Sequence, residues 1–394
     1  MNYIQQVFKG KNEWYHWLIT VCLVLFGWQI LGAIPLIIVA LSKTENLAEF
    51  TRLAENNFTT AGLNKNFLLF LMLFMFAVGL VFLCIGVKYI HKRSIKSLIT
   101  SRKKIDWQRF LFGFIVWGII AFTMSYCSIL LAPENFIWNF NAKHFFILVA
   151  ISFIFIPLQT SFEELLFRGY FMQGIGAATT KSKFPLYFIT LLISIIIISI
   201  LNLMYGYNIF SMIIVLGIIV FLSHFVISEK LMNSLLNSNL NKTLFGYLNT
   251  KLTPLLITSL IFGLLHGANP EVAKLGQITM VFYIGTGLFF GIVTLMDEGT
   301  ELALGLHAIN NISAAFLITT DWTVFQTDAL YIDTSEPSVT WEMFIPVFVF
   351  YPLMLLLFSK KYGWQNWKEK LAEKIEMPTK IDANYKNLDE IGTT

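Results

Sequence analysis

The chain has 394 residues, of which 56% are hydrophobic, 16% aromatic and only 13% charged. An ordinary soluble domain is about 25% charged, so the composition excludes a soluble globular protein and equally a disordered chain or a coiled coil. Three cysteines inside apolar runs exclude a disulfide scaffold. The dispersed net charge of +4 indicates loops that face an anionic lipid bilayer and argues against a nucleic-acid partner. The composition therefore predicts a multi-pass integral protein of the cell membrane.

Long apolar runs recur along the whole chain. A helix that crosses a bilayer needs about 20 mainly apolar residues. About ten runs approach this length, at 16–41, 66–90, 110–132, 145–175, 184–204, 208–228, 253–268, 275–296, 302–319 and 342–359. The runs are continuous and do not alternate with period two, which favours helices over a β-barrel. We expect an all-α polytopic membrane bundle of about ten transmembrane helices.

The charges in two connections predict the orientation of the bundle. Residues 91–109 contain seven basic side chains and one acidic one, whereas 320–342 contains five acidic side chains and no basic one. Basic loops stay on the cytoplasmic side, so 91–109 is expected inside and 320–342 outside. Ten spans then place both the N- and the C-terminus in the cytoplasm.

Two further segments are expected to lie outside the spans. The Asn-rich stretch 229–252 is predicted to run along the membrane interface. The tail 360–394 is predicted to be cytoplasmic, and its first part carries Trp364, Trp367 and Leu371 at helical spacing, which is typical of a helix resting at the headgroups.

Three charged residues fall inside a predicted span. An ionisable side chain at the centre of a span costs at least about 2.5–3.5 kcal/mol, and almost all charged residues of this chain avoid it. The exceptions are Glu163, Glu164 and Arg168. Glu164 and Arg168 are one helical turn apart and can pair. Glu163 points about 100° away around the helix, so it needs another polar partner.

Two histidines in other apolar runs are candidate partners for Glu163. His266 lies in 253–268, and His307 lies in 302–319 with Asn311 one turn beyond it. At 1.5 Å per residue from the cytoplasmic span ends, Glu163 and His266 lie about 20 Å deep. Asn311 lies about 18 Å deep and His307 about 12 Å deep by the same measure. These depths predict one shared polar pocket.

The pocket supports two kinds of chemistry. A Glu and a His that share one water molecule form a hydrolytic base, and His307 with Asn311 can donate hydrogen bonds to a developing oxyanion. This scheme requires no cofactor. Alternatively, Glu163, His266 and His307 form a two-His, one-carboxylate set that could bind a divalent metal such as zinc. Spacing leaves both schemes open, and the H-E-x-x-H and G-x-S-x-G motifs are absent from the sequence.

Three short motifs resemble those of a known family. The sequences EELLFR at 163–168, FGLLH at 262–266 and HAINN at 307–311 resemble the E-E-x-x-x-R, F-x-x-x-H and H-x-x-x-N motifs of the CAAX protease and bacteriocin-processing (CPBP or Abi) family. The resemblance covers about 150–319. It implies an intramembrane endopeptidase related to the type II CAAX prenyl endopeptidase, which acts on a peptide or protein at the membrane.

The resemblance also implies roles for the six polar residues. Glu163 and His266 would correspond to the water-activating pair, His307 and Asn311 to the oxyanion side, and Glu164 and Arg168 would complete the first motif. The family is commonly labelled metalloprotease, although a Glu/His-activated water needs no metal ion.

The resemblance divides the chain into four parts. These are N-terminal transmembrane helices at 1–140, the protease-like core at 141–320, the outer acidic loop and last transmembrane helix at 321–359, and the tail at 360–394. About 100 residues separate the first motif from the second, where some tens are expected, so a helical pair near 184–250 is read as an insertion in the core.

Other functions fit the same residues. A family member with an inert pocket would serve as a membrane scaffold or a bacteriocin-immunity protein. A proton-coupled transporter is disfavoured, because the polar residues form one compact cluster and no inverted repeat is apparent.

Overall fold

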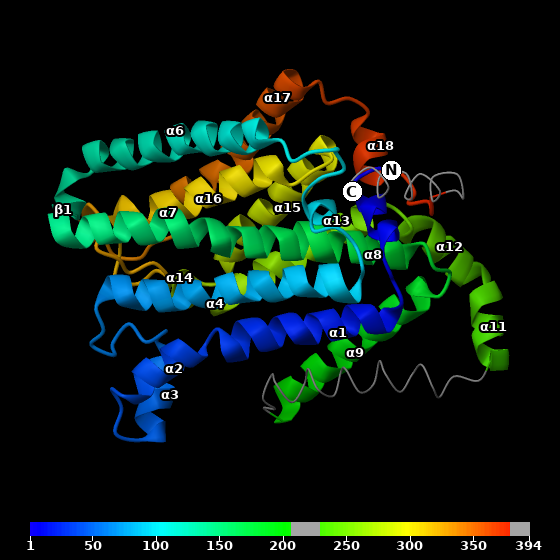
Figure 1. The fold of residues 1–394 in the computed structure, drawn as a ribbon, viewed down its shortest axis with the longest axis horizontal. Helices are drawn as coiled ribbons and strands as arrows, with labels where there is room; N and C mark the ends of the chain where they lie inside the picture. Colours follow the sequence, from blue (N-terminus) through cyan, green and yellow to red (C-terminus); the bar gives the residue numbers. More distant parts are fainter. Residues whose placement is uncertain (206–228, 379–394) are drawn as a thin grey trace, which may run out of the picture.

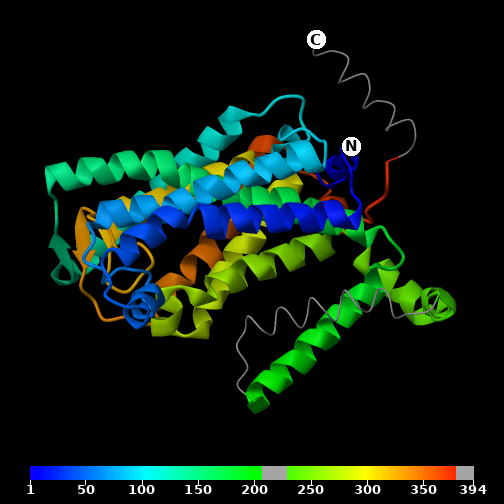
Figure 2. The same cartoon turned by 60° about the horizontal axis from the view of Figure 1, so that its bottom comes forward.

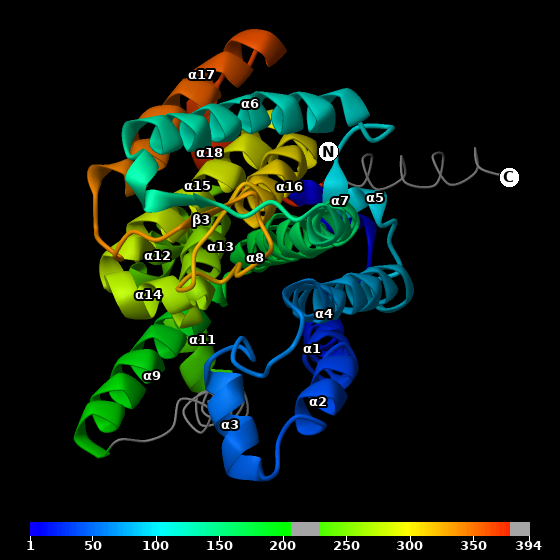
Figure 3. The same ribbon diagram turned by 90° about the vertical axis from the view of Figure 1, so that its left-hand side faces the viewer.

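The computed structural model describes residues 1–205 and 229–378. The helices α1, α4, α6, α7 and α16 lie side by side along the long axis of the molecule (Figure 1). Residues 1–10 lie with α18 at one end, which we call the N-terminal end. The strands lie with α3 and α14 at the other, which we call the sheet end. Viewed from the sheet end, α1 and α4 lie on one side of α7, and α6, α15 and α16 lie on the other (Figure 3).

The α-helices are α1 (Trp14–Leu25), α2 (Ile34–Leu41), α3 (Leu47–Glu55), α4 (Lys65–Ile85), α5 (Lys96–Ile99), α6 (Trp107–Leu131), α7 (Ala142–Glu164), α8 (Met172–Thr179), α9 (Phe184–Tyr205), α11 (Glu229–Asn237), α12 (Asn239–Leu248), α13 (Leu252–Leu265), α14 (Pro270–Leu275), α15 (Met280–Asp297), α16 (Glu301–Phe316), α17 (Tyr351–Tyr362) and α18 (Trp367–Ala372). Four segments are π-helical: η2 (Phe26–Leu31), η3 (Gly86–Ile90), η5 (Leu165–Phe171) and η9 (Pro346–Phe350). Short 3-10 helices are η1 (Ile4–Lys9), η4 (Pro133–Asn135), η6 (His266–Ala268), η7 (Gln277–Thr279) and η8 (Trp341–Met343).

Six helical segments of the described chain are long and apolar enough to cross a membrane. They are Trp14–Leu41, Lys65–Ile90, Trp107–Leu131, Ala142–Thr179, Gln277–Asp297 and Trp341–Tyr362. Two shorter apolar helices are Phe184–Ile195 and Leu252–Ala268. The protein is therefore a multi-pass membrane bundle, as predicted, while the number of crossings and the side of the termini stay predictions. The expected span 208–228 lies outside the described residues.

The helix α16 lies at the centre of the bundle. Most of its side chains are buried, and it packs closely on α6 and α7. Gly113 of α6 permits the close approach, because a Cβ atom at this position would lie 2.7 Å from the carbonyl oxygen of Leu302. Gly287 of α15 does the same against α13, where a Cβ atom would lie 2.8 Å from the carbonyl oxygen of Ser259. These two glycines allow the helices around the predicted site to pack closely together.

The insertion predicted between the first two motifs is helical where it is described. The helix α9 projects away from the bundle (Figures 2 and 3). It is followed, after residues outside the described part, by α11 and α12. The expected interfacial stretch 229–252 is therefore largely helical.

A small sheet at the sheet end corrects the expectation of an all-α fold. Strands β1 (Phe136–Trp138), β2 (Ile318–Thr319) and β3 (Tyr331–Asp333) pair in the order β1-β3-β2. β3 is antiparallel to β1 and parallel to β2. Strands of two or three residues are too short to show an alternating pattern, so the sequence did not reveal them. The sheet fixes the connection after α16 to the segment before α7.

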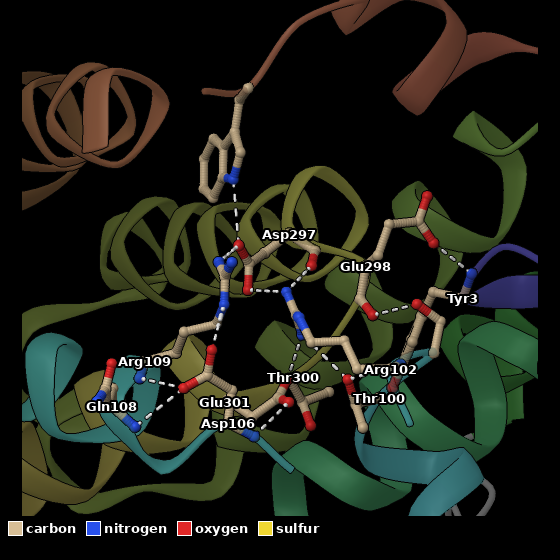
Figure 4. Close-up of polar contacts among 12 residues, drawn as sticks. Tyr3, Thr100, Arg102, Asp106, Gln108, Arg109, Asp297, Glu298, Thr300 and Glu301 are labelled. Carbon is tan, nitrogen blue, oxygen red and sulfur yellow. Dashed lines mark hydrogen bonds and ion pairs between the residues drawn. The ribbon is translucent and has the colours of Figure 1, made fainter. Parts of the chain in front are cut away.

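Polar side chains join four segments at the N-terminal end, in a cluster that we call the polar junction (Figure 4). The guanidinium of Arg102 contacts Asp297 Oδ2 at 2.8 Å and Glu301 Oε2 at 3.0 Å, and both carboxylates are 1% exposed. Arg109 also pairs with Asp297. The junction holds the turn between α15 and α16, and so the first turn of the helix that carries His307.

The polar junction corrects the prediction for the start of the tail. Trp364 is only 8% exposed and its indole N–H donates to Asp297 Oδ1 at 3.1 Å. Its ring packs against Phe358 in the main hydrophobic core. A buried carboxylate needs donors, and this contact holds Trp364 inside the protein and away from the headgroups.

Candidate functional site

The EELLFR motif spans a change of helix type. Glu163 and Glu164 end α7, and the chain continues without a break into the π-helix η5, which carries Arg168. Segments of π-helix inside α-helices are rare and occur frequently at functional sites. The side chains of Glu164 and Arg168 are fully buried.

The predicted pairing of Glu164 with Arg168 is confirmed. Arg168 Nη1 donates to Glu164 Oε1 at 3.1 Å, and Nη2 donates to the carbonyl oxygen of Gly287 at 3.1 Å. The guanidinium also lies 4.2 Å from the centroid of the Phe262 ring. A buried charge persists only with such partners, so Arg168 ties η5 to α13 and α15.

His307 lies between the two glutamates. Its Nδ1 atom is 2.8 Å from Glu164 Oε1, and its Nε2 atom is 3.5 Å from Glu163 Oε2. An ionised carboxylate can only accept, so the Nδ1 proton is donated to Glu164 and the ring orientation is fixed. This contact leaves Nε2 directed toward Glu163. The sequence pairs Glu164 with Arg168, but it does not reveal that the same carboxylate also binds His307.

The two carboxylate oxygens of Glu163 have different surroundings. Oε1 accepts a hydrogen bond from Gln159 Nε2 at 2.6 Å. Oε2 is buried and has no hydrogen-bond donor among the described residues. Glu164 Oε2 is also buried without a partner among the described residues, but Glu164 lines neither cavity of the site, whereas Glu163 lines both. Because a buried carboxylate oxygen normally has a partner, Glu163 Oε2 is therefore the atom best placed to bind a small polar molecule or to take a proton.

Asn311 reaches Glu163 through a residue that sequence reasoning missed. Asn311 Nδ2 donates to Gln159 Oε1 at 3.1 Å. Gln159 is only 6% exposed and stands one helical turn before Glu163. A polar side chain at that spacing inside an apolar run is the signal that could have identified it.

His266 belongs to the same region and does not touch the other site residues directly. Its Nδ1 atom lies 2.8 Å from the carbonyl oxygen of Phe262. A carbonyl only accepts, so Nδ1 carries the proton and Nε2 remains a free acceptor. The imidazole ring stacks on Tyr283 at 4.5 Å between centroids, and the Tyr283 hydroxyl donates to Glu271. Tyr283 and Glu271 were also missed by sequence reasoning.

Two cavities meet at Glu163 and His266. The first has a volume of about 390 Å³ and a mostly apolar lining, which includes Val24, Trp28 and Phe167. The second has a volume of about 540 Å³, contains His307 and Asn311 in its wall, and extends to Thr320 and Thr323 at the sheet end. Both cavities are lined by Phe76, Glu163, Phe262, His266 and Asn269. The predicted site residues other than the buried pair Glu164 and Arg168 therefore all line the second cavity.

The alternative metal set does not come together. Across residues 1–205 and 229–378, no group of three or more His, Cys, Asp or Glu side chains is placed to hold a metal ion. His307 directs Nδ1 to Glu164, and His266 directs Nδ1 to its own helix. Glu163, His266 and His307 thus do not fit a divalent metal in this arrangement.

Comparison with known proteins agrees with the motifs. A model of the family described as "Type II CAAX prenyl endopeptidase Rce1-like" matches residues 220–313, which include His266, His307 and Asn311. The "Uncharacterized protein YyaK" of Bacillus subtilis (strain 168) is 25% identical over 279 residues, which are 71% of this chain and 70% of that protein. No solved structure matches the chain. The predicted resemblance is confirmed for residues 220–313, which match an Rce1-like type II CAAX prenyl endopeptidase (CPBP) domain and contain the second and third motifs, while the first motif at 163–168 lies before the matched range.

Proposed function

We propose that the protein is an intramembrane endopeptidase that hydrolyses peptide bonds with a water molecule activated by Glu163. The observation that carries the proposal is the placement of Glu163 Oε2, which is buried, without a hydrogen-bond donor in the described chain, and 3.5 Å from His307 Nε2. An unpartnered carboxylate oxygen beside an imidazole inside a membrane bundle is costly for stability. Such a cost is typical of a site where chemistry takes place.

The steps follow from the free atoms of the site. Glu163 Oε2 takes a proton from water, and the oxygen of that water forms a bond to the carbonyl carbon of the peptide. His266 Nε2 holds the water by accepting its second hydrogen. The C–N bond then breaks, and the proton passes from Glu163 to the leaving nitrogen.

The developing oxyanion is stabilised by donors on α16. One amide hydrogen of Asn311 is used by Gln159, and the second is free to donate. His307 lies on the same helix, with its ring held by Glu164 beside Glu163 Oε2. A single donor of this kind is worth about 100- to 1,000-fold in rate in enzymes that hydrolyse amides.

The two cavities support a substrate class. The apolar cavity suits an apolar segment of a peptide or protein that lies in or at the bilayer, and the second cavity suits a more polar stretch of the same chain. The scissile bond would lie at their shared wall, beside Glu163 and His266. We place the protein in the cell membrane with both termini in the cytoplasm.

The proposal is tested with purified protein in detergent and a peptide library, comparing the wild type with Glu163→Gln. We expect cleavage by the wild type and a loss of at least about 100-fold in the variant, because the general base is removed. Glu134→Gln is the matched control, since Glu134 is an exposed carboxylate in the connection before α7. Equal cleavage by the wild type and Glu163→Gln would exclude the assignment. No cleavage by either would favour a membrane scaffold or an immunity protein.

A further inference from the structure

A chain of side-chain hydrogen bonds runs from helix α6 to the proposed base. The indole N–H of Trp117 donates to Asn310 Oδ1 at 3.0 Å, and Asn310 Nδ2 donates to Asn311 Oδ1 at 3.0 Å. Asn311 then donates to Gln159, and Gln159 donates to Glu163 Oε1. We call this series the amide chain.

The amide chain has one direction. An indole nitrogen can only donate, and an ionised carboxylate can only accept. Each amide between them must therefore present its oxygen toward Trp117 and its NH₂ group toward Glu163. Both ends enforce the same orientation, so none of the three amides can rotate by 180° without losing two hydrogen bonds.

Trp117, the first member of the amide chain, is held in the hydrophobic core. Trp117 is 6% exposed and belongs to the main hydrophobic core, where its ring lies 5.6 Å from the Tyr351 ring. Trp117 lines neither cavity, so it has no direct route to a substrate bound in either of them. Hydrogen bonds in such a low-dielectric setting strengthen one another.

The last amide of the amide chain, Gln159, binds only one of the two carboxylate oxygens of Glu163. Gln159 occupies Oε1 at 2.6 Å, which leaves Oε2 as the atom without a donor, facing His307. Buried amides need hydrogen-bond partners in any protein, and this need alone would explain why these bonds form. That need does not explain why the series ends on Glu163, which lines both cavities, and not on Glu164, whose Oε2 is also buried without a partner among the described residues but whose side chain lines neither cavity.

We propose that Trp117 and Gln159 are positioning residues that hold Glu163 with Oε2 turned toward the reacting water. Gln159 acts on Glu163 directly, and Trp117 acts through Asn310 and Asn311 by fixing the direction of the chain. This inference rests on the proposed peptidase function and names residues beyond the three family-like motifs.

The test measures kcat and KM of purified variants on the peptide that the wild type cleaves fastest in the library. Gln159→Leu removes the bond to a charged group, so kcat falls roughly 10- to 150-fold. Trp117→Phe keeps an aromatic ring in the core and removes the N–H together with part of the indole ring, so kcat falls about 2- to 10-fold. KM stays within about twofold in both, because ground-state binding is unchanged.

The double variant distinguishes positioning from packing. Gln159→Leu breaks the amide chain between Asn311 and Glu163, so Trp117 can no longer influence the orientation of Glu163. Adding Trp117→Phe then has no further effect, and the double variant has the kcat of Gln159→Leu alone. Multiplied effects would overturn the proposal, and so would wild-type kcat in Gln159→Leu while Glu163→Gln is inactive.

Two controls separate these effects from general destabilisation. Trp107→Phe changes an exposed tryptophan of the same helix. Gln173→Leu removes a buried glutamine that binds Arg93 and the carbonyl oxygen of Ser97 at the N-terminal end. We expect Gln173→Leu to lower the unfolding temperature and to keep kcat. If Gln173→Leu lowers kcat as much as Gln159→Leu, the role of Gln159 is structural only. A wild type that cleaves no peptide overturns the proposed function, and the positioning role with it.

Discussion

His307 Nδ1 lies 2.8 Å from Glu164 Oε1, although 143 positions separate the two residues along the chain. The same oxygen accepts from Arg168 Nη1 at 3.1 Å. One buried carboxylate thus holds a guanidinium of its own helix and the imidazole of another. Glu164 is the residue through which α7 fixes α16, and through α16 the orientation of His307 toward Glu163.

We expect Glu164→Gln to destabilise the protein strongly. The substitution leaves Arg168 as a buried charge without its carboxylate, which costs about 3–5 kcal/mol. Thermal unfolding in detergent measures the loss. The control is Glu49→Gln, which removes one partner of an exposed pair with Arg52 at 3.9 Å and costs under about 1 kcal/mol. Similar losses in the two variants would contradict a special role for the buried pair.

Tyr283 is expected to support His266 in two separable ways. Tyr283→Phe keeps the stacked ring and removes the hydroxyl bonded to Glu271 and Asn269, so activity falls by no more than about 10-fold. Tyr283→Leu also removes the stacking surface, so the imidazole is free to rotate and the loss is larger. Steady-state cleavage of one peptide compares the two variants. Equal losses would show that the ring does not position His266.

Stability is expected to decrease as the pH falls below about 6.5, because of His91. This residue is fully buried between the carbonyl oxygen of Lys11 and the hydroxyl of Tyr170. Burial, aided by the charge of Arg93, lowers the pKa of His91 to about 4. Between about pH 4 and 6.5 the unfolded chain binds more protons than the folded protein. The contribution of neutral His91 to the free energy of unfolding is therefore complete above that range and is lost on acidification.

The measurement for His91 is the unfolding free energy across this pH range. The contribution amounts to at most about 3 kcal/mol, and His91→Gln is expected to remove that part of the pH dependence. His144→Gln serves as the control, since its side chain is 44% exposed. An unchanged pH profile in His91→Gln would contradict the assignment.

Arg102→Ala is expected to loosen the polar junction. Asp297 and Glu301 would lose a shared guanidinium while remaining buried, with a cost of about 3–5 kcal/mol. Because Glu301 begins α16, proteolysis near 299–301 is also expected to increase. Lys103→Ala, an exposed neighbour, is the control for both readouts. A wild-type unfolding temperature in Arg102→Ala would show that Arg109 alone is sufficient.

The predicted orientation can be checked with single cysteines. In a variant without Cys22, Cys84 and Cys127, Lys103→Cys tests the basic loop and Ser338→Cys tests the acidic one. Both positions are exposed. A membrane-impermeant thiol reagent applied to intact cells is expected to label Cys only at position 338, with position 103 labelled after permeabilisation. The reverse pattern would place the termini outside.

The elements that were predicted well are those with long uniform patterns. The apolar runs 66–90 and 275–296 became Lys65–Ile90 and Gln277–Asp297, because bilayer thickness demands a length that the sequence must show. The strands β1 to β3 and the burial of Trp364 were missed. Both depend on contacts between segments that are not adjacent along the chain, such as Trp364 with Asp297 and β1 with β3, and such contacts leave no local pattern.

The sequence by itself determined a multi-pass helical membrane protein, the pairing of Glu164 with Arg168, and the resemblance to the family that matches residues 220–313. These features are local, since they depend on residue type, helical periodicity and the cost of charge in lipid. Only the tertiary structure decided which oxygen of Glu163 is free, that His307 binds Glu164, and that Gln159 links Asn311 to the base. Such choices depend on how α6, α7 and α16 rotate against one another, and close packing at residues such as Gly113 sets that rotation.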